Sequence, residues 1–507
     1  MKKILAVVLD GWGMREEVHG NAIKQAVLPN FTKMWNEYPH SLLSASGAAV
    51  GLPDGQFGNS EVGHLALGAG RLIKQKEVVI DEMFQNNDLD KNEYFNETIE
   101  YAKTNNKPIH MMALCSDGGV HALVRHFIKM LEELKKREVK EVYFHLITDG
   151  RDTDSHSSYK YIKEVEDAAK KLGIGAVATI SGRYDIMDRD NKWDRIKKAY
   201  DVITRGAGNR TLDIKMYIDT CYSKGVTDEF IPPVLVNEKG IIKNGDVLLW
   251  MNYRPDRARQ ILQTLTDPNF NSFQHYKMPD LKVITLYPVK DVENIHPLLE
   301  NTVVNNSFGV YISNLGLTQA RIAETEKFAH VTNFFDGEFK GKIDNCDRFL
   351  IPSPLVDTYD MKPEMSAIDV CKKTINCMDK DYDFILVNFA NPDMVGHTGN
   401  MEAAIKAVQV VDLCLGKLKE VADDNFYTMF VLADHGNADI MLDEKNNPVT
   451  THTTSLVPFI VTDKKIKVEN GHITQFAPTI LEYMDIAIPK EMKGTKSLIE
   501  KQAEEQI

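Results

Sequence analysis

The sequence has little cysteine and no long apolar run. Its six cysteines are dispersed over 507 residues and form no CxxC pair, a usage typical of reduced thiols rather than of a disulfide framework. No apolar stretch is long enough to span a bilayer. The N-terminal run MKKILAVVLDGWG is broken by Asp10, so it predicts a first strand rather than a signal peptide. We therefore expect a cytoplasmic protein with no membrane partner.

Basic residues are in deficit. Lys and Arg number 60 against 73 Asp and Glu, and the net charge is −13. Such a field repels phosphate backbones, so we expect no nucleic-acid partner. A small anionic ligand would need a local basic pocket. The sequence also lacks repeats, and its last residues, EKQAEEQI, predict a solvated helical tail.

Short apolar runs alternate with amphipathic segments along the chain, which predicts an α/β fold with parallel sheets and crossover helices. Residues 4–10, 384–390 and 428–434 are apolar on both faces and end beside polar residues. We expect these three runs to be buried neighbouring strands. The middle of the chain repeats the alternation, with strands expected in 109–117, 142–150, 174–183 and 247–254, and helices in 124–134, in 157–172 and from Trp193.

Because this middle segment could bury its own core, the sequence predicts two α/β domains. The outer domain would comprise residues 1–75 and 300–507, and the inserted domain would comprise residues 78–296. Two linkers would join them, since the inserted segment must leave the outer domain and return to it.

Polar residues gather where the predicted outer strands end or in adjoining turns: Asp10, Asp393, His397, Asp434, His435 and His452. Asp393 and His397 are four residues apart, a spacing that places both on one face of a helical turn. Carboxylates with imidazoles suit zinc, manganese, iron or cobalt, and six ligands are too many for one open catalytic ion. The pattern predicts two metal ions at the carboxyl ends of the strands. The alternative is that each residue is an ordinary cap or turn residue.

The glycine-rich stretch 48–70 contains Ser60 just before a predicted short helix. A serine at that place could be an N-cap. It could also be a nucleophile, which needs activation because a serine hydroxyl is weak at neutral pH. No GxSxG elbow is present, so a metal cluster is the expected source of activation.

Guanidinium groups accumulate at strand ends of the middle segment: Arg183, Arg189, Arg254, Arg257 and Arg259, with Arg151 at a further strand end. Arginine forks bind phosphate and carboxylate bidentately, so this set could supply the local basic pocket. Salt bridging with the interleaved Asp185, Asp188 and Asp256 is the alternative. Asp152, next to Arg151, could act as a general base. His121 follows a flexible double glycine and could be a helix N-terminal residue with no role.

Motifs in order along nearly the whole chain resemble one family: DGWG, GNSEVGH, SDGGVH, TDGRDT, RPDRARQ, RIAETEKFAHVT, PSP with KPEMSA, NPDMVGHTG, ADHGNAD and HTT. They are similar to those of the cofactor-independent (2,3-bisphosphoglycerate-independent) phosphoglycerate mutases of the alkaline phosphatase superfamily. The resemblance implies an outer alkaline-phosphatase-like domain with two manganese ions, or magnesium, cobalt or zinc in their place. It also implies an inserted transferase domain that binds the glycerate.

The resemblance implies a role for each matching residue. One metal ion would be bound by Asp393, His397 and His452, and the other by Asp10, Ser60, Asp434 and His435. Substrate contacts would come from His121, Arg151, Asp152, Arg183, Arg189, Arg254, Arg257 and Lys327.

The implied reaction interconverts 3-phosphoglycerate and 2-phosphoglycerate in glycolysis and gluconeogenesis, through a phosphoserine on Ser60 and without bisphosphoglycerate. Asp152 would shuttle the proton and Lys327 would steady the phosphoryl oxygens. The family is generally monomeric. This chain departs from the family pattern at Ala122 and Ser455, which stand where serine and asparagine are usual, and near Gly337, which lacks the usual paired glycine.

Two rival readings differ in their substrate or in their class. A phosphatase or a phosphopentomutase of the same superfamily would share the metal ligands, whereas the middle-segment arginines favour a small carboxylated substrate. A scaffold protein with a dead active site would have no need of Ser60 beside intact metal ligands, and its function would survive chelation.

Overall fold

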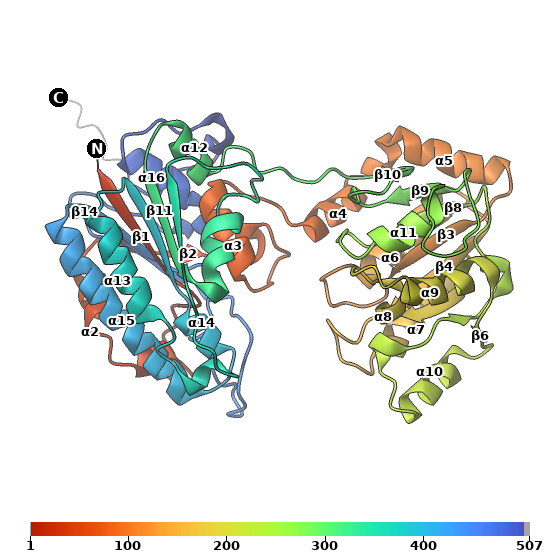
Figure 1. Cartoon of the computed structure of the whole chain (residues 1–507), viewed down its shortest axis with the longest axis horizontal. Coiled ribbons are helices and arrows are strands. Elements are labelled where there is room, and N and C mark those ends of the chain that lie inside the picture. The colour runs from red at the N-terminus through yellow and green to blue at the C-terminus, as the bar shows by residue number, and fades with distance from the viewer. Residues whose placement is uncertain (1, 501–507) are drawn as a thin grey trace. The chain divides into compact units, whose positions relative to one another are not determined.

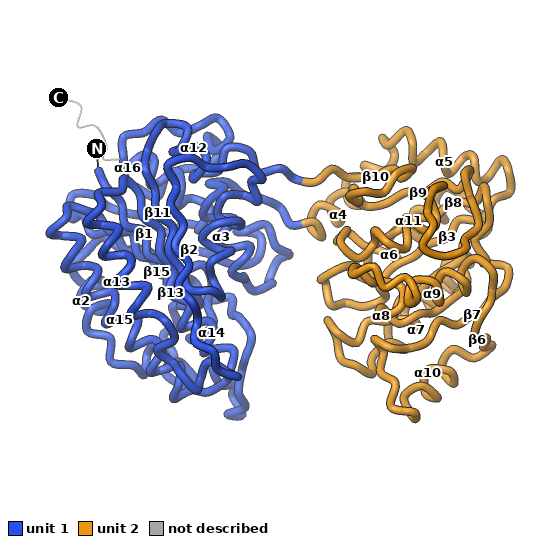
Figure 2. The backbone as a smooth tube through the Cα atoms, in the orientation of Figure 1, with its two compact units in different colours: residues 1–75, 302–507 blue, residues 76–301 orange. Residues whose placement is uncertain are grey.

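The computed structural model describes residues 2–500, so the predicted C-terminal tail lies outside the described residues except for Glu500. The chain forms two compact units, drawn in blue and orange in Figure 2. Unit 1 comprises Met1–Gln75 and Thr302–Ile507, and unit 2 comprises Lys76–Asn301. The chain therefore passes between the units twice. Each unit has its own buried apolar cluster.

Each unit is built on one sheet of eight strands with helices packed against it, which confirms the predicted α/β class (Figure 1). The unit 1 sheet has, in spatial order, β12 (Cys346–Ile351), β11 (Gln319–Glu324), β13 (Phe384–Phe389), β1 (Lys3–Leu9), β14 (Tyr427–Leu432), β15 (Val457–Val461), β2 (His40–Ser44) and β16 (Gly471–His472).

The three apolar runs expected to be neighbours are the centre of the unit 1 sheet. β1 pairs in parallel with both β13 and β14, and Ala6 lies opposite Leu386 on one side and Phe430 on the other. This confirms the prediction. The expectation of parallel strands is wrong for β15, which is antiparallel to β14 and to β2. The connection from β14 to β15 contains no helix that could make a parallel crossover.

The helices of unit 1 are α1 (Ala22–Gln25), α2 (Pro29–Glu37), α3 (Ser60–Ala69), α12 (Phe308–Asn314), α13 (Ala367–Met378), α14 (Asn391–Gly396), α15 (Met401–Asp424) and α16 (Phe476–Tyr483). α13 and α15 contact each other and the strands β13 and β14, while α3 contacts α16. β1 is buried along almost its whole length, as expected for a central strand covered on both faces.

The unit 2 sheet has the order β10 (Ile295–Pro297), β9 (Lys282–Thr285), β8 (Val247–Trp250), β3 (Ile109–Leu114), β4 (Val142–Thr148), β5 (Ala176–Gly182), β7 (Val234–Leu235) and β6 (Asn209–Arg210). All its pairs are parallel except that of β5 with β7. Its helices are α4 (Lys76–Gln85), α5 (Glu93–Thr104), α6 (Val124–Lys136), α7 (Ser158–Leu172), α8 (Arg183–Ile186), α9 (Trp193–Arg205), α10 (Ile214–Ser223) and α11 (Arg259–Thr266). The helices expected in 124–134, in 157–172 and from Trp193 are confirmed by α6, α7 and α9.

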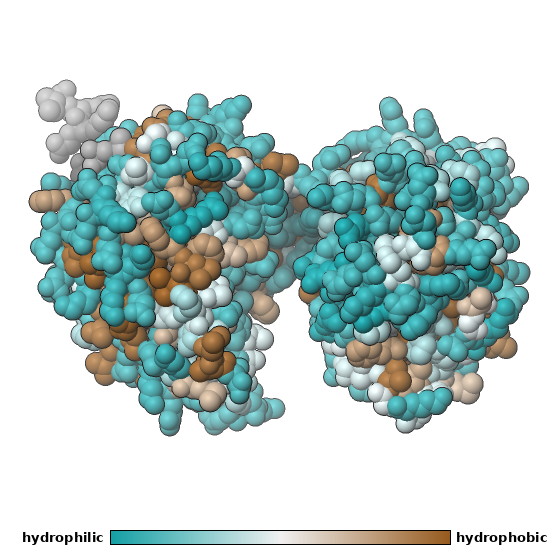
Figure 3. Space-filling model, in the orientation of Figure 1, coloured by the Kyte–Doolittle hydropathy of each residue, from teal (hydrophilic) through white to brown (hydrophobic). Residues whose placement is uncertain are grey.

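Apolar residues are sparse on the face of the molecule that Figure 3 shows, and the described helices do not meet the requirements of a membrane span. The face shown in Figure 3 is mostly hydrophilic, with apolar residues in scattered groups. Within residues 2–500, no helix has both the length and the apolar composition needed to cross a membrane.

Candidate functional site

Three strands of unit 1 end at one edge of the sheet and deliver polar residues there. Asp10 follows β1, Asp393 lies in α14 just after β13, and Asp434 with His435 follows β14. Because β1 pairs in parallel with both neighbours, the carboxyl ends of the three strands coincide. These side chains are at most 2% exposed. The structure thus brings predicted ligands from distant parts of the sequence into one buried cluster.

Glycines allow these segments to approach closely. Gly11 has φ +76°, and a Cβ there would lie 2.8 Å from Cα of Asp393. A Cβ on Gly63, in α3, would lie 2.8 Å from the carbonyl oxygen of Asp434. A side chain at either glycine would force the polar segments apart.

One group of potential ligand atoms forms a tight triangle. Nε2 of His397 and Nε2 of His452 each lie 3.2 Å from Oδ1 of Asp393, and the two nitrogens are 3.0 Å apart. The other ring nitrogens are held by backbone: Nδ1 of His397 contacts the Thr450 carbonyl at 2.8 Å, and Nδ1 of His452 contacts the Gly58 carbonyl at 2.9 Å. Each Nδ1 must donate, so each Nε2 presents a lone pair to the group, as a metal ligand requires.

A second group surrounds Ser60. Nε2 of His435 lies 3.5 Å from both Oδ1 of Asp10 and Oδ2 of Asp434, and 2.9 Å from Oγ of Ser60. Nδ1 of His435 contacts the carbonyl of Gly436 at 3.2 Å. Oδ2 of Asp434 is buried without a hydrogen-bond donor, which leaves it free to bind a cation.

His435 joins the two groups. Its ligand atom lies within 4.8 Å of those of Asp393 and His452 as well as those of Asp10 and Asp434. Two adjacent groups of carboxylate and imidazole donors fit two divalent cations such as manganese, cobalt or zinc. The predicted division of ligands separates His435 from Asp393 and His452 more sharply than this geometry does.

The charges of the cluster also favour cations. Burial raises the pKa of Asp10, and the nearby Asp434 carboxylate adds to this. Burial opposes ionisation of Asp393 too, but the Lys327 ammonium and the adjacent His397 and His452 lower the pKa of Asp393 well below its ordinary value. Three buried carboxylates around one ammonium leave negative charge that divalent cations would neutralise.

Lys327 lies at the end of a 3₁₀ turn, Thr325–Lys327, that follows β11. Its Nζ lies 2.7 Å from Oδ1 of Asp10, 2.7 Å from Oγ of Ser60 and 2.5 Å from Oδ2 of Asp393. Burial lowers the pKa of Lys327, but the surrounding carboxylates outweigh it and raise the pKa above its ordinary value. The ammonium therefore stays charged beside the serine hydroxyl.

Ser60 is the first residue of α3, and it is not the cap of that helix. Asn59 caps the helix, because its side chain accepts a hydrogen bond from the backbone N–H of Val62. The N-cap interpretation of Ser60 is therefore wrong. Its hydroxyl faces the polar cluster, where it also lies 3.3 Å from Oδ1 of Asp10.

Unit 2 has a cluster of opposite charge, also at strand ends. Arg183, directly after β5, is 3% exposed, and its Nη1 lies 2.7 Å from Asp149 and 2.5 Å from Oδ2 of Asp152. His121 is buried beside it, with Nδ1 lacking a hydrogen-bond partner. Burial and the neighbouring Arg183 lower the pKa of His121 to about 4. The imidazole is thus neutral and has an unused polar atom.

The alternative of salt bridging holds for part of this cluster. Asp256 pairs with Arg189 at 2.9 Å and with Arg254 at 3.2 Å. Arg151 pairs with Glu229. The other two interleaved aspartates pair outside the predicted set, Asp185 with Lys198 and Asp188 with Arg195.

Arg257 carries the unbalanced charge. Its Nη1 donates to the carbonyl of Met187 at 3.0 Å. Burial lowers the pKa of Arg257, and repulsion from Arg189, Arg183 and Arg151 lowers it further. Guanidinium groups that repel one another would be stabilised by a bound anion. The structure brings the predicted substrate residues of unit 2 together in this way, whereas Lys327 belongs to unit 1.

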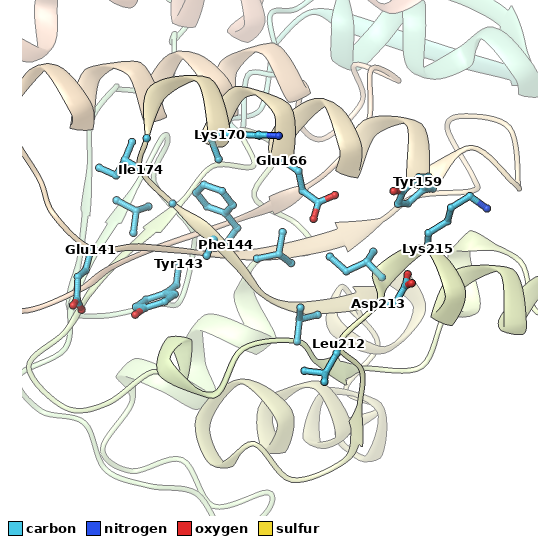
Figure 4. Close-up of a pocket in the computed structure, with 18 of the residues that line it drawn as sticks. Glu141, Tyr143, Phe144, Tyr159, Glu166, Lys170, Ile174, Leu212, Asp213 and Lys215 are labelled. Atoms are coloured by element: carbon cyan, nitrogen blue, oxygen red, sulfur yellow. The ribbon is translucent and has the colours of Figure 1, made fainter.

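The cavity drawn in Figure 4 is separate from this basic cluster. It has a volume of ≈ 750 Å³ and is lined by Glu141, Phe144, Glu166 and Leu212 among others. It lies where β4 and β5 begin, since Val142 and Ala176 also line it. The basic residues follow the opposite ends of these strands, so the cavity is not part of the candidate site.

Comparisons with known proteins agree with this geometry. A family model described as Metalloenzyme superfamily matches residues 2–488. The 2,3-bisphosphoglycerate-independent phosphoglycerate mutase of Clostridium kluyveri is 44% identical, over 98% of this chain and 99% of its own, and that of Trichodesmium erythraeum is 44% identical, over 98% and 96%. The chain belongs to this mutase family. It is therefore an isomerase.

A solved mutase structure has the same fold. The crystal structure of Leishmania mexicana phosphoglycerate mutase at low cobalt concentration is similar with a TM-score of 0.70 and 29% identity, covering 99% of this chain and 98% of that chain. That structure was determined with cobalt, one of the metals that the donor set fits.

Three residues that contact the polar cluster of unit 1 were not predicted from the sequence. Asn437 donates to Oδ1 of Asp393 at 2.8 Å. Asn388 and His64 form hydrogen bonds around Asp10 and Ser60. His64 lies four residues after Ser60, a helical spacing that could have revealed it. Asn388 is hidden inside an apolar run.

The positions that depart from the family pattern lie beside the clusters or in a turn. Ala122 is buried next to His121. Oγ of Ser455 donates to Asp439 at 2.6 Å, on the loop that carries His452. Gly337 has φ +71°, a conformation that favours glycine.

Proposed function

We propose that this protein interconverts 3-phosphoglycerate and 2-phosphoglycerate without bisphosphoglycerate, through a phosphoserine on Ser60. The observation that carries the proposal is the environment of Oγ of Ser60, which has Lys327 at 2.7 Å, His435 at 2.9 Å and Asp10 at 3.3 Å. A serine hydroxyl becomes a nucleophile when positive charge stabilises its alkoxide.

The chain holds donors for two metal ions. Asp393, His397 and His452 would hold one ion, and Asp10, Ser60, Asp434 and His435 would hold the other. The ions, which we propose to be manganese with magnesium, cobalt or zinc as alternatives, would supply positive charge to the serine oxygen and the phosphoryl oxygens.

The reaction has two steps. In the first, the Ser60 alkoxide forms a bond from Oγ to phosphorus while the bond between phosphorus and O3 of 3-phosphoglycerate breaks, and Asp152 gives O3 a proton. In the second, Asp152 takes the proton of the 2-hydroxyl, whose oxygen attacks phosphorus while the bond from phosphorus to Oγ breaks, which restores the alkoxide. Lys327 would stabilise the phosphoryl oxygens, and Asp152 would act first as a general acid and then as a general base.

Unit 2 would bind the carboxylate of the glycerate. The mutual repulsion around Arg257 supports anion binding there, and the unpaired Nδ1 of His121 is available to a substrate oxygen. Arg151, Arg183, Arg189 and Arg254 would complete the set. A small carboxylated substrate fits this cluster better than a pentose phosphate, which has no carboxylate to bind.

The test is isomerase activity of chelator-stripped protein, measured with enolase as the coupling enzyme and without bisphosphoglycerate. We expect activity on adding Mn²⁺ and none in Ser60→Ala. Ser41→Ala, which alters a buried serine in β2, is the matched control and should stay active. Release of free phosphate without isomerisation would identify a phosphatase instead.

We also propose that the protein acts as a cytoplasmic monomer. Its six cysteines are all free, which fits a reducing compartment. Sedimentation equilibrium that gives a dimer mass at micromolar concentration would contradict the monomer.

A further inference from the structure

Asn388 lies in the middle of the cluster and is completely buried. Its Nδ2 lies 2.7 Å from Oδ2 of Asp10 and 3.1 Å from Nε2 of His64, and its Oδ1 has no hydrogen-bond partner. The reverse orientation of the amide would place Oδ1 against the Asp10 carboxylate. The carboxylate therefore fixes the orientation, and Nδ2 donates one hydrogen to Asp10 and the other to His64.

This direction determines the proton of His64. Because Nε2 accepts from Asn388, the ring hydrogen must be on Nδ1. Nδ1 lies 2.9 Å from the carbonyl oxygen of Ser60 and 3.2 Å from Oδ2 of Asp434. The shorter of the two contacts is to the carbonyl, so the hydrogen bond goes there and Oδ2 of Asp434 is left without a donor.

We propose that Asn388 and His64 are a positioning pair that sets the rotation of the Asp10 carboxylate and holds the first turn of α3. Oδ2 of Asp10 is tied to Asn388, and Oδ1 is thereby turned towards Ser60 and Lys327. At the other end of the chain of hydrogen bonds, His64 holds the backbone of Ser60. The expected effect of the pair on turnover rests on the proposed function, whereas its expected effect on metal affinity does not.

The arrangement argues for positioning rather than for simple satisfaction of buried polar groups. The pair links three segments that are distant in sequence: the end of β1, the start of α3 and the interior of β13. Both ends of the chain terminate on cluster residues. An apolar side chain at 388 would be the ordinary choice within a buried strand, so the asparagine there has a polar task.

The first experiment measures Mn²⁺ binding to chelator-stripped protein by calorimetry. Asn388→Ala should weaken one of the two binding events about 10- to 100-fold, as for other residues that orient metal ligands. The matched control is Gln319→Ala, which removes a buried amide from the neighbouring strand β11, where it donates to the Gly309 carbonyl. That variant should lose stability and keep its Mn²⁺ affinity.

The second experiment tests whether the two residues act as one unit. His64→Phe keeps a ring of similar size and removes both nitrogens, and it should also weaken Mn²⁺ binding. In the double variant the two effects should not multiply, because breaking either hydrogen bond already breaks the chain. In an active enzyme, kcat should fall while KM for 3-phosphoglycerate changes less than about twofold, since neither residue is expected to contact substrate.

The outcomes separate this inference from the proposed function. If the parent protein has no isomerase activity but the variants bind Mn²⁺ more weakly than the parent, the positioning role of Asn388 and His64 stands and the proposed function is overturned. Unchanged Mn²⁺ affinity in folded variants would overturn the positioning role of Asn388 and His64. Effects of the two single substitutions that multiply in the double variant would overturn it as well. If Asn388→Ala fails to fold, Asn388→Ser replaces it. The serine side chain is shorter than the asparagine side chain, so it cannot bridge Asp10 and His64 as the amide does.

Discussion

The two units use one architecture for opposite charges. Both are eight-stranded sheets that place polar side chains at the carboxyl ends of parallel strands. In unit 1 these are carboxylates and imidazoles that form two groups, and the ligand atoms of each group lie within 4.8 Å of one another. In unit 2 they are guanidiniums, and Arg257 is repelled by its neighbours. The sheet fixes where a site forms, and the residues after each strand decide whether it attracts cations or anions.

Removing a carboxylate from unit 1 should have the largest effect. Asp393→Asn keeps the shape and removes a charge from the centre of the first ligand group. We expect loss of one metal ion and a fall in kcat/KM of about a thousandfold or more, corresponding to several kcal/mol. Metal content and the coupled assay measure both. Full activity of the variant with one ion per protein would contradict the proposal that unit 1 needs two cations.

Removing a cation from unit 2 should have a smaller effect and a different kinetic signature. Arg257→Ala should raise KM for 3-phosphoglycerate about 10- to 100-fold, because a charge-assisted hydrogen bond contributes about 1.5–3 kcal/mol. Arg210→Ala, which breaks an exposed ion pair with Glu238, is the matched control. If both variants keep the parent KM, the unit 2 cluster does not bind substrate.

Buried histidines should make unit 2 sensitive to acid. Burial lowers the pKa of a group of unit 2 histidines: His110, His121, His126 and His145. A lowered pKa favours the neutral ring in the folded state, so this stability is present above the unfolded value of about 6.5 and is lost as pH falls towards about 4.

For one such histidine the loss should be on the order of 1–3 kcal/mol. Hydrogen exchange between pH 7 and pH 4.5 should show unit 2 losing protection as pH falls. His126→Gln, which removes a ring that contacts Asp81 at 3.0 Å, should flatten that dependence. A variant with the parent slope would exclude His126 as a source.

The smallest expected effect concerns the helix starts that present Ser60 and Arg183. α3 is capped by Asn59, whereas α8 has no side-chain cap. Asn59→Ala should lower the free energy of unfolding by about 1 kcal/mol, the usual loss for an N-cap. Urea denaturation measures it. A fall of several kcal/mol would mean that Asn59 does more than cap the helix.

Regular hydrophobic patterns in the sequence made much of the fold predictable. The runs that became β1, β13 and β14 are apolar on both faces, and α6, α7 and α9 have clear apolar stripes. The direction of β15 was not predictable, because the loop before it, which carries proposed metal ligands, has no periodic pattern. Asp393 and His397 could be paired from their spacing, but His452 joins them only through tertiary packing.

Some site residues leave no signal of their own in a single sequence. Lys327 follows β11 in a short 3₁₀ turn and was found only through the family resemblance. Asn388 lies among apolar residues, where its hydrogen bonds depend on Asp10, a residue near the other end of the chain. Long-range pairings of this kind are set by the completed sheet.

The order of strands in unit 1 has a consequence for biosynthesis. β1 is made first, but the neighbours on either side of it, β13 and β14, are made near the end. On the ribosome, β1 must remain unpaired while all of unit 2 emerges at about 5–20 residues per second. Unit 2 has its own core and can fold during that time. The nascent strand β1, apolar on both sides, is thus exposed to aggregation until β13 and β14 have been made.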